Sequence, residues 1–246
     1  MKIIISPAKK MNIDSDTLPV LSQPLFADDA AHLAAQLRDM DAPALKKLWQ
    51  CSDKLTAENI ERLAVFDPAR AQTPALLAYE GLQYQHLAPA VLDREALAYL
   101  QDHLRILSGL YGVLRPFDAV MPYRLEMQAK LAVDGTKDLY AYWSKRLYEA
   151  LDESGGLILN LASEEYARAI RPYVDPGTRF ISVRFGEMVE GRVKQKGTFA
   201  KMARGEMVRF MAEQRLSRLD ELRHFDALGL HYEEALSDDD TLTFVK

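Results

Sequence analysis

The chain has 246 residues, of which 48% are hydrophobic and 27% are charged, and its formal net charge is −5. This composition predicts a globular protein with a sizeable core, and the negative charge argues against a protein that coats nucleic acid indiscriminately. No apolar run reaches the roughly 18 residues of a transmembrane helix. The single cysteine, Cys51, rules out an internal disulfide framework and suits a reducing cytoplasm. The five histidines are scattered, without the spacing of a zinc site.

The first predicted element is a strand, Lys2 to Ile5, whose three consecutive isoleucines suit burial on both faces of a sheet. A Ser-Pro-Ala-Lys-Lys segment follows and places Lys9 and Lys10 at the carboxyl end of the strand. Ligands of open α/β sheets bind at that edge, so both lysines are candidate anion contacts. The alternative is that they are two solvated side chains.

Residues 27–66 are predicted to be helical and could form a small lobe. One helix covers Ala27 to Asp39, Pro43 opens a second, and a third runs to about Phe66. The last two are joined by a short connection, which is the shape of a helix-hairpin-helix over residues 44–66.

In a helix-hairpin-helix the amides of the hairpin face a phosphate. Ala57 and Ile60 match two positions of that motif, whereas Cys51 and Asp53 stand where glycines are expected. Lys54 lies next to the hairpin and is a candidate phosphate contact. An ordinary αα-hairpin is the alternative interpretation, and it is favoured on these residues.

The stretch from Leu104 to Met127 carries the strongest indication of a binding site. An apolar run, Leu104 to Leu107, predicts a buried strand, and a segment broken by glycines and prolines follows it. Polar and aromatic side chains on a rigid loop after a buried strand are typical of a site, although a surface connection would look similar. The candidate residues here are Ser108, Tyr111, Arg115, Asp118, Tyr123, Arg124 and Glu126.

The second half alternates helices and strands. Leu139 to Leu151 is predicted to be one amphipathic helix, and residues 156–161 a second buried strand that ends at Asn160. Ser163 is predicted to cap the helix that begins at Glu164 and Glu165; a helix amino terminus after a strand is also a possible anion site.

The next predicted elements are a hairpin and a long helix. The hairpin turns at Glu190-Gly191, and Thr198 caps a helix to about Leu216. Seven basic residues stand against two acidic ones from Arg192 to Arg215, which suggests a localised anion site in an acidic chain. The basic candidates in it are Lys194, Lys196, Lys201 and Arg204.

No composition shift or linker divides the chain. We therefore predict an α/β (mixed α+β) fold, in which residues 1–246 form a single compact domain with a central mixed sheet surrounded by helices.

With these motifs in view, the sequence resembles the YaaA family of bacterial peroxide-stress-resistance proteins along essentially its whole length. The resemblance rests on Ser6-Pro-Ala-Lys9, on residues 107–127, on Asn160-Leu-Ala-Ser163-x-Glu165-Tyr166 and on Lys201-x-x-Arg204-Gly205. It implies a cytoplasmic protein that limits oxidative damage to DNA under peroxide stress and is linked to low free iron. It also implies a helix-hairpin-helix and a positively charged cleft for duplex or branched DNA.

The leading functional hypothesis is DNA binding that follows the backbone rather than the base sequence. The candidate nucleic-acid contacts are Lys9, Lys10, Lys54, Arg115, Tyr123, Arg124, Lys194, Lys196, Lys201 and Arg204. The alternative is an enzyme acting on a nucleotide or a nucleic-acid base, because acids and hydroxyls accompany the cations. Its candidate catalytic residues are Ser108, Tyr111, Asp118, Asn160, Glu165 and Lys201. Direct iron binding is a third, weaker hypothesis; we expect no cofactor, no metal site and no membrane partner, and we favour a monomer.

Overall fold

The computed structural model of the protein describes residues 1–151 and 156–246. Within these residues the main sheet has eight strands, seven of them in the order β11-β12-β9-β8-β1-β5-β6, with β10 paired to β9. The strands are β1 (Lys2–Ile5), β5 (Leu104–Ser108), β6 (Gly112–Leu114), β8 (Leu157–Asn160), β9 (Arg179–Val189), β10 (Arg192–Lys194), β11 (His231–Tyr232) and β12 (Thr241–Val245).

The β1 strand occupies the middle of the sheet, as its isoleucine run predicted. Ile3, Ile4 and Ile5 are fully buried, and Ile3 lies opposite Leu104 of β5 on one side and Leu159 of β8 on the other. Both pairings are parallel. Parallel strands covered on both faces need apolar side chains in both directions, which is what three successive β-branched residues supply.

The sheet is mixed. Strands β12, β9, β8, β1 and β5 are parallel neighbours, whereas β6, β10 and β11 pair antiparallel with β5, β9 and β12. The α/β prediction is therefore confirmed. Because β1, β5 and β8 run the same way, their carboxyl ends meet at one edge of the sheet, where the segments after Ile5, Ser108 and Asn160 begin.

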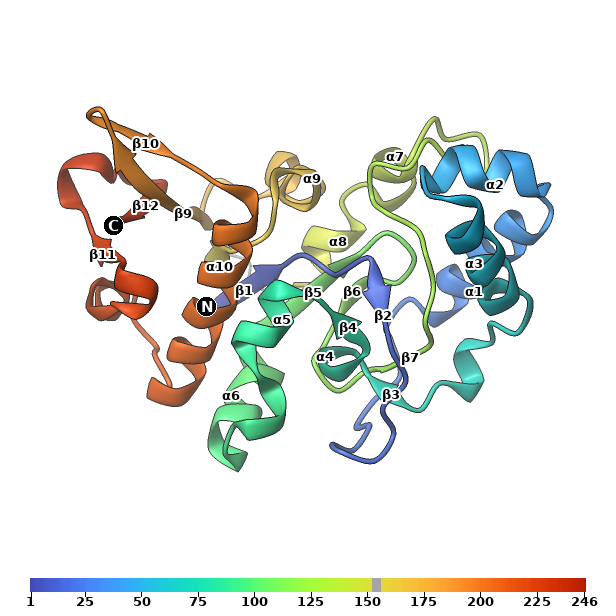
Figure 1. Ribbon diagram of the computed structural model, residues 1–246, viewed down its shortest axis with the longest axis horizontal. Helices are drawn as coiled ribbons and strands as arrows, with labels where there is room; N and C mark the ends of the chain where they lie inside the picture. Colours follow the sequence, from blue (N-terminus) through green and yellow to red (C-terminus); the bar gives the residue numbers. More distant parts are fainter. Residues whose placement is uncertain (152–155) are drawn as a thin grey trace.

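Helices surround this sheet, and in Figure 1 α1, α2 and α3 gather at the end of the molecule opposite β10, β11 and β12. The helices are α1 (Ala27–Arg38), α2 (Ala42–Trp49), α3 (Asp53–Ala64), α4 (Ala75–Ala78), α5 (Leu82–Leu87), α6 (Arg94–His103), α7 (Leu139–Trp143), α8 (Arg146–Glu149), α9 (Glu164–Ala167) and α10 (Gly197–Gln214). Two small ladders pair β2 (Lys10–Met11) with β4 (Tyr79–Glu80), and β3 (Thr73–Pro74) with β7 (Ala119–Val120).

The α2 and α3 helices form a hairpin across Gln50, which adopts a left-handed φ of 46°. Ser52 caps α3 by accepting a hydrogen bond from the Leu55 amide at 3.4 Å, and Asp53 pairs with Lys46 at 2.6 Å. An acidic side chain and a serine cap occupy the turn whose amides would face a phosphate. The αα-hairpin is thus confirmed, whereas its identity as a DNA-binding helix-hairpin-helix is not.

The predicted helix from Leu139 to Leu151 is wrong in one respect, because it is two short helices. Ser144 lies between α7 and α8 with a φ of 48°, a conformation that interrupts a helix. The apolar face of the segment is nevertheless fully buried; it consists of Leu139, Trp143, Leu147 and Leu151. The Trp143 indole donates to the Gly109 carbonyl at 3.0 Å, so tertiary packing bends the segment while keeping its apolar face inward.

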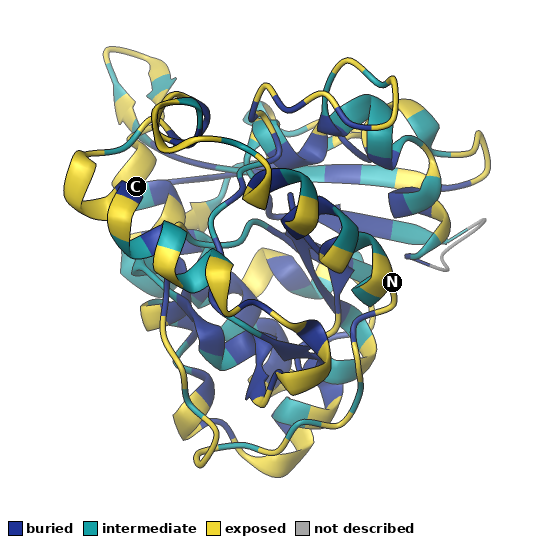
Figure 2. Cartoon of the chain, turned by 90° about the vertical axis from the view of Figure 1, so that its right-hand side faces the viewer, coloured by how far each residue is buried: buried dark blue, intermediate teal, exposed yellow. Residues whose placement is uncertain are grey.

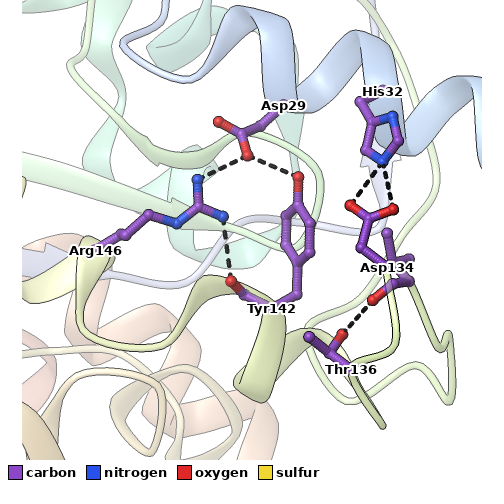
Figure 3. A network of polar contacts seen from close by, with 7 residues as sticks. Asp29, His32, Asp134, Thr136, Tyr142 and Arg146 are labelled. Atoms are coloured by element: carbon purple, nitrogen blue, oxygen red, sulfur yellow. Dashed lines mark hydrogen bonds and ion pairs between the residues drawn. The ribbon is translucent and has the colours of Figure 1, made fainter.

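A polar network fastens α1 to α7 and α8, as Figure 3 shows. The Asp29 Oδ1 atom accepts hydrogen bonds from the Tyr142 hydroxyl at 2.6 Å and from the Arg146 guanidinium at 2.8 Å. Beside it, His32 contacts the Asp134 carboxylate at 3.0 Å. These contacts join the helical region of residues 27–66 to the second half of the chain.

The structure confirms the predicted alternation of helices and strands in the second half of the chain. The β9–β10 hairpin turns at Glu190 and Gly191, which have φ of 53° and 75°, as a two-residue hairpin requires. The α10 helix begins at Gly197 rather than after Thr198.

In Figure 2 the buried residues concentrate in the strands and the exposed ones cover the outer helices and loops. None of the helices in the described ranges has the length and apolarity needed to span a membrane.

Candidate functional site

A cavity of about 500 Å³ lies at the carboxyl ends of β1 and β8. Its walls come from the segment after β1, from β4 and α5, from residues 123–126, from the start of α9 and from α10. The side chains and backbone that line it belong to Ser6, Pro7, Ala8, Lys9, Lys10, Glu80, Gly81, Leu82, Gln83, Tyr84, Tyr123, Arg124, Leu125, Glu126, Ser163, Glu165, Tyr166, Thr198, Lys201 and Arg204. The motifs around Lys9, Arg124, Ser163 and Lys201, which are far apart in the sequence, therefore line one cavity.

Two serines join the strand ends at the base of this cavity. The Ser163 amide donates to Ser6 Oγ at 2.8 Å, and the two hydroxyl oxygens lie 3.2 Å apart. Ser163 is the N-cap residue of α9, but its side chain makes no capping hydrogen bond. The predicted N-cap position is thus confirmed, but the hydroxyl is paired with Ser6 and not with an amide of the helix.

The α5 and α10 helices form the opposite wall, and they approach each other very closely. A Cβ on Gly205 would collide with the backbone carbonyl oxygen of Gln83 and would lie 2.8 Å from the Cβ of His86. The Tyr84 hydroxyl, also on α5, donates to the Ser6 carbonyl at 2.9 Å. Glycine at position 205 therefore lets α10 bring Lys201 and Arg204 against the segment that follows β1.

Five cations line the cavity, and three of them already have an acidic partner. Lys9 lies 3.4 Å from the Glu126 carboxylate and Arg124 lies 3.1 Å from it. Lys10 pairs with Glu80 at 2.6 Å. Arg124 also donates to the Trp49 carbonyl at 3.3 Å, which ties the helical region to the cavity wall.

The side chains of the other two cations, Lys201 and Arg204, make no ion pair or hydrogen bond with any residue in the described ranges. They are three residues apart on α10, so they share one face of the helix. The Nε atom of Arg204 is buried without a partner, and burial lowers the pKa of its guanidinium. Arginine remains protonated in proteins, so an uncompensated positive charge lies in the wall.

Glu165, in the first turn of α9, supplies an acidic group to the cavity wall. One of its carboxylate oxygens accepts a hydrogen bond from the Gln128 amide at 3.2 Å. Burial raises the pKa of this carboxyl, and the nearby Glu126 charge raises it further, against the opposing effects of the Gln128 amide and Lys9. Carboxyls whose pKa is raised by burial are frequent acid–base groups of functional sites, which makes Glu165 the acid–base candidate of this cavity.

Tyr123 connects the cavity to a buried hydroxyl chain. Its oxygen lies 2.6 Å from Ser108 Oγ and 2.9 Å from the Tyr79 hydroxyl. Ser108 Oγ already accepts from the amides of Leu110 and Tyr111, so its own proton points to Tyr123. Burial raises the pKa of Tyr123 to about 12. Ser108 is fully buried and reaches the cavity only through Tyr123.

Asp118 lies outside the cavity. Its two carboxylate oxygens accept from the Ser22 hydroxyl at 2.6 Å and from the Arg115 amide at 2.8 Å. Burial is the largest effect on its pKa, which is raised. Asp118 therefore holds the turn after β6 to the segment before α1.

Two further candidates are structural contacts. The Asn160 side-chain oxygen accepts from the Ala162 amide at 2.9 Å, and its amide nitrogen donates to Ser182 Oγ at 3.1 Å. Tyr111 is buried, and its hydroxyl accepts from the Met121 amide at 3.1 Å. Asn160 thus shapes the turn that delivers Ser163, and Tyr111 supports the segment that leads to Tyr123.

Four basic candidates are exposed and do not line the cavity. Arg115 lies beside Asp118, and Lys54 lies in the first turn of α3. Lys194 ends β10, and Lys196, directly before α10, pairs with Glu187 at 2.7 Å. The cavity therefore unites Lys9, Lys10, Arg124, Lys201 and Arg204, and it leaves these four on other surfaces.

Sequence reasoning did not single out Gln83, a lining residue whose side chain can hydrogen-bond to a ligand. Gln83 is buried on α5, and its side-chain nitrogen has no hydrogen-bond partner in the part of the chain that the structure describes. Nothing in the surrounding Tyr-Glu-Gly-Leu-Gln-Tyr run marks it, because only its contact with α10 brings it to the cavity. Glu126, recognised only as one polar residue of its loop, emerges as the shared partner of Lys9 and Arg124.

The described ranges contain no group of three or more His, Cys, Asp or Glu side chains placed to hold a metal ion.

Comparison with known proteins places the chain in a family. The profile described as "Peroxide stress protein YaaA" matches residues 1–236. A "UPF0246 protein" of Lactiplantibacillus plantarum is 48% identical over 245 residues, covering 100% of this chain and 99% of the relative. A second "UPF0246 protein", from Desulfitobacterium hafniense, is 47% identical over 246 residues, covering 100% of this chain and 98% of the relative. The chain belongs to the YaaA peroxide stress protein family, which supports a role in peroxide stress.

Proposed function

We propose that this protein binds duplex or branched DNA in the cytoplasm through the cations around the cavity and thereby protects it during peroxide stress. The observation that carries the proposal is the pair Lys201 and Arg204. Both project from one face of α10 at the cavity, and neither has an acidic partner among the described residues. A partly buried guanidinium without a counter-charge among the described residues favours an anionic ligand, and phosphate is the anion that arginine binds with the best geometry.

The contacts expected from this surface are with the DNA backbone. Lys9 and Lys10 are exposed beside the cavity, although each is paired with a glutamate. Such exposed pairs are weak, so a phosphate can compete for these lysines. The cavity is lined by loops, by the short helices α5 and α9 and by one long helix, α10, which packs closely against α5 and is therefore not free to enter a major groove. Recognition should therefore follow backbone and shape rather than base sequence.

A gel-shift titration at several salt concentrations tests the proposal. Each phosphate contact contributes about −0.9 to the slope of log affinity against log salt. The double variant Lys201→Ala, Arg204→Ala should weaken binding to every duplex alike and flatten that slope by about 2. Arg209→Ala is the matched control on the same helix, because Arg209 is paired with Glu213 at 2.8 Å and does not line the cavity. Wild-type affinity and slope in the double variant would exclude this surface as the DNA site.

A survival assay links binding to the cellular role. Cells that lack their own family member should regain peroxide resistance with the wild-type gene and with Arg209→Ala, but not with the double variant. The expected link to low free iron is tested separately, by measuring chelatable iron in the same strains. Equal survival with the wild-type and double-variant genes would separate peroxide resistance from these cations.

A reaction on a bound nucleotide is the second candidate function. It is favoured by the position of Glu165, whose raised pKa suits proton transfer, in the same cavity as Lys201 and Ser163. The test is to incubate the protein with DNA carrying oxidised bases and to analyse the products for a released base or a strand break. Glu165→Gln should abolish product formation while retaining binding; an absence of product with the wild type would remove this candidate.

A further inference from the structure

The cavity holds unpartnered hydrogen-bond donors in its walls. The side-chain nitrogen of Gln83 and the Nε atoms of Arg124 and Arg204 are buried and have no partner among the described residues. All three residues line the same cavity, as does Glu126, whose buried Oε1 atom accepts no hydrogen bond but already faces the charges of Lys9 and Arg124. Buried polar atoms are nearly always satisfied in native proteins, so three unsatisfied donors around one hollow indicate a ligand rich in acceptors.

Two of these donors are held in place by the fold. Gln83 belongs to α5 and Arg204 to α10, and the close contact of Gly205 with the Gln83 backbone fixes the two helices together. Gln83 and Arg204 therefore present donors from adjoining walls without a rearrangement of the backbone. Lys201, one turn earlier on α10 than Arg204, adds a second positive charge at the same side.

The other walls are unlike those of a simple phosphate site. Pro7, Ala8, Leu82 and Leu125 are apolar liners, and the buried rings of Tyr84 and Tyr166 add aromatic surface. A volume of about 500 Å³ falls within the range of small-molecule sites and far exceeds what one phosphate occupies. Glu165 provides a polar group from the first turn of α9. The occupant should combine an anionic group with a flat, partly apolar body that carries polar edges.

We propose that the cavity is a subsite for one nucleoside monophosphate unit. Its phosphate lies against Arg204 and Lys201, and its base lies against the apolar wall, with its polar edge directed to Gln83 and Glu165. The unit can come from DNA, as a nucleotide extruded from the duplex, or from the pool of free nucleotides. Extrusion from DNA rests on the proposed DNA-binding function, whereas binding of a free nucleotide does not.

The first arm of the experiment follows extrusion. A duplex carries 2-aminopurine at a mismatch, where unstacking raises its fluorescence. Binding of the wild-type protein should raise the fluorescence several-fold. Arg204→Ala should lose this rise at concentrations where a gel shift shows the duplex bound. Ala8→Leu, which narrows the cavity and keeps every cation, should lose it too, and Arg209→Ala should retain it. Circular dichroism confirms that each variant is folded.

The second arm uses free ligands. Calorimetric titration with deoxyadenosine monophosphate and with inorganic phosphate tests whether the base adds to the phosphate. The nucleotide should bind at least tenfold more tightly than phosphate, and Arg204→Ala should weaken it at least tenfold. A fluorescence rise without measurable nucleotide binding would identify DNA as the source; nucleotide binding without the rise would identify the free pool.

The outcomes separate this inference from the function on which it partly rests. If the wild type shifts duplex DNA but gives neither a fluorescence rise nor nucleotide binding, the subsite proposal is overturned and DNA binding stands. If it binds the nucleotide but no duplex, the DNA-binding function fails and the subsite stands. A fluorescence rise that persists in both Arg204→Ala and Ala8→Leu would show that unstacking happens outside the cavity, and it would also overturn the proposal.

Discussion

Ser6 Oγ accepts a hydrogen bond from the Ser163 amide at 2.8 Å, across 157 residues of sequence. This contact joins the segments that leave two neighbouring parallel strands, β1 and β8. The cavity begins at that junction, so a single side-chain oxygen helps to position both the lysines after β1 and the helix that carries Glu165.

Removal of that oxygen should loosen the junction. Ser6→Ala leaves the Ser163 amide without its partner, and we expect a loss of about 1 kcal/mol in the free energy of unfolding. Urea denaturation measures it. Ser15→Ala is the control, because Ser15 is exposed and bonds only to its neighbour Asp16, and it should change stability by less than about 0.5 kcal/mol. Equal stability of the two variants would mean that solvent replaces the Ser6 contact.

The close approach of α5 and α10 gives a second prediction. In Gly205→Ala the new Cβ collides with the Gln83 carbonyl oxygen, so the helices must separate at a cost of about 1–3 kcal/mol. The shift should also displace Arg204 and weaken DNA binding. Thermal unfolding and gel shifts measure the two effects.

Gly197→Ala is its control on the same helix. Among the described residues, no atom beyond its chain neighbours and the adjoining helix backbone lies within 4 Å of a Cβ added at Gly197, and alanine favours helix formation, so unchanged or slightly higher stability is expected. If Gly205→Ala proved as stable as Gly197→Ala, the tight helix contact would not be required for folding.

Glu165 should give the protein a specific pH dependence. Because burial raises its pKa in the folded state, the native carboxyl binds its proton more tightly than the unfolded one. Its contribution to stability is therefore most favourable at acidic pH, and stability falls as pH rises through the raised pKa. Protonation also removes a negative charge from the cavity, so DNA affinity should increase as pH falls over the same range.

The comparison with Glu165→Gln isolates this effect from other titrating groups. The variant should show a flatter dependence of stability on pH in that range, and its DNA affinity should change less between neutral and mildly acidic pH. Denaturation midpoints and gel shifts at several pH values measure both. Parallel curves for the wild type and the variant would contradict a raised pKa at Glu165.

Asp118 should affect stability and not binding. Asp118→Ala removes the acceptor for the Ser22 hydroxyl and the Arg115 amide, and we expect a loss of about 1–3 kcal/mol. Because Asp118 does not line the cavity, affinity for DNA should be unchanged well below the unfolding temperature. Asp239→Ala, at an exposed position, serves as the control for stability. A selective loss of DNA affinity in folded Asp118→Ala would place this carboxyl in the binding surface after all.

Some of the fold could be read from local patterns. The isoleucine run of β1 and the Glu190-Gly191 turn each depend on a few neighbouring residues. The break at Ser144 could not be read in this way, because burial of the stripe around Trp143 is compatible with one helix or with two. Packing against Gly109 and Phe26 accompanies the bent form.

The candidate site shows the same difference between local sequence patterns and tertiary packing. Their residue types made Ser108 and Asp118 candidate catalytic residues, yet the side chains of both make hydrogen bonds inside the fold. Gln83 had no signal at all, and its importance comes from the α5–α10 contact alone.

The sequence by itself predicted the buried strands β1, β5 and β8 and the helices α1 and α10, and it identified the motifs around Lys9, Arg124, Ser163 and Lys201 as those worth following. Only the tertiary structure decided that these four motifs share one cavity and that Arg115 and Lys54 do not belong to it. The physical reason is that periodicity and turn chemistry act over a few residues, whereas a cavity is formed by contacts such as Ser6 with Ser163 and Gly205 with Gln83. Those contacts depend on how distant segments pack, and no local pattern encodes that packing.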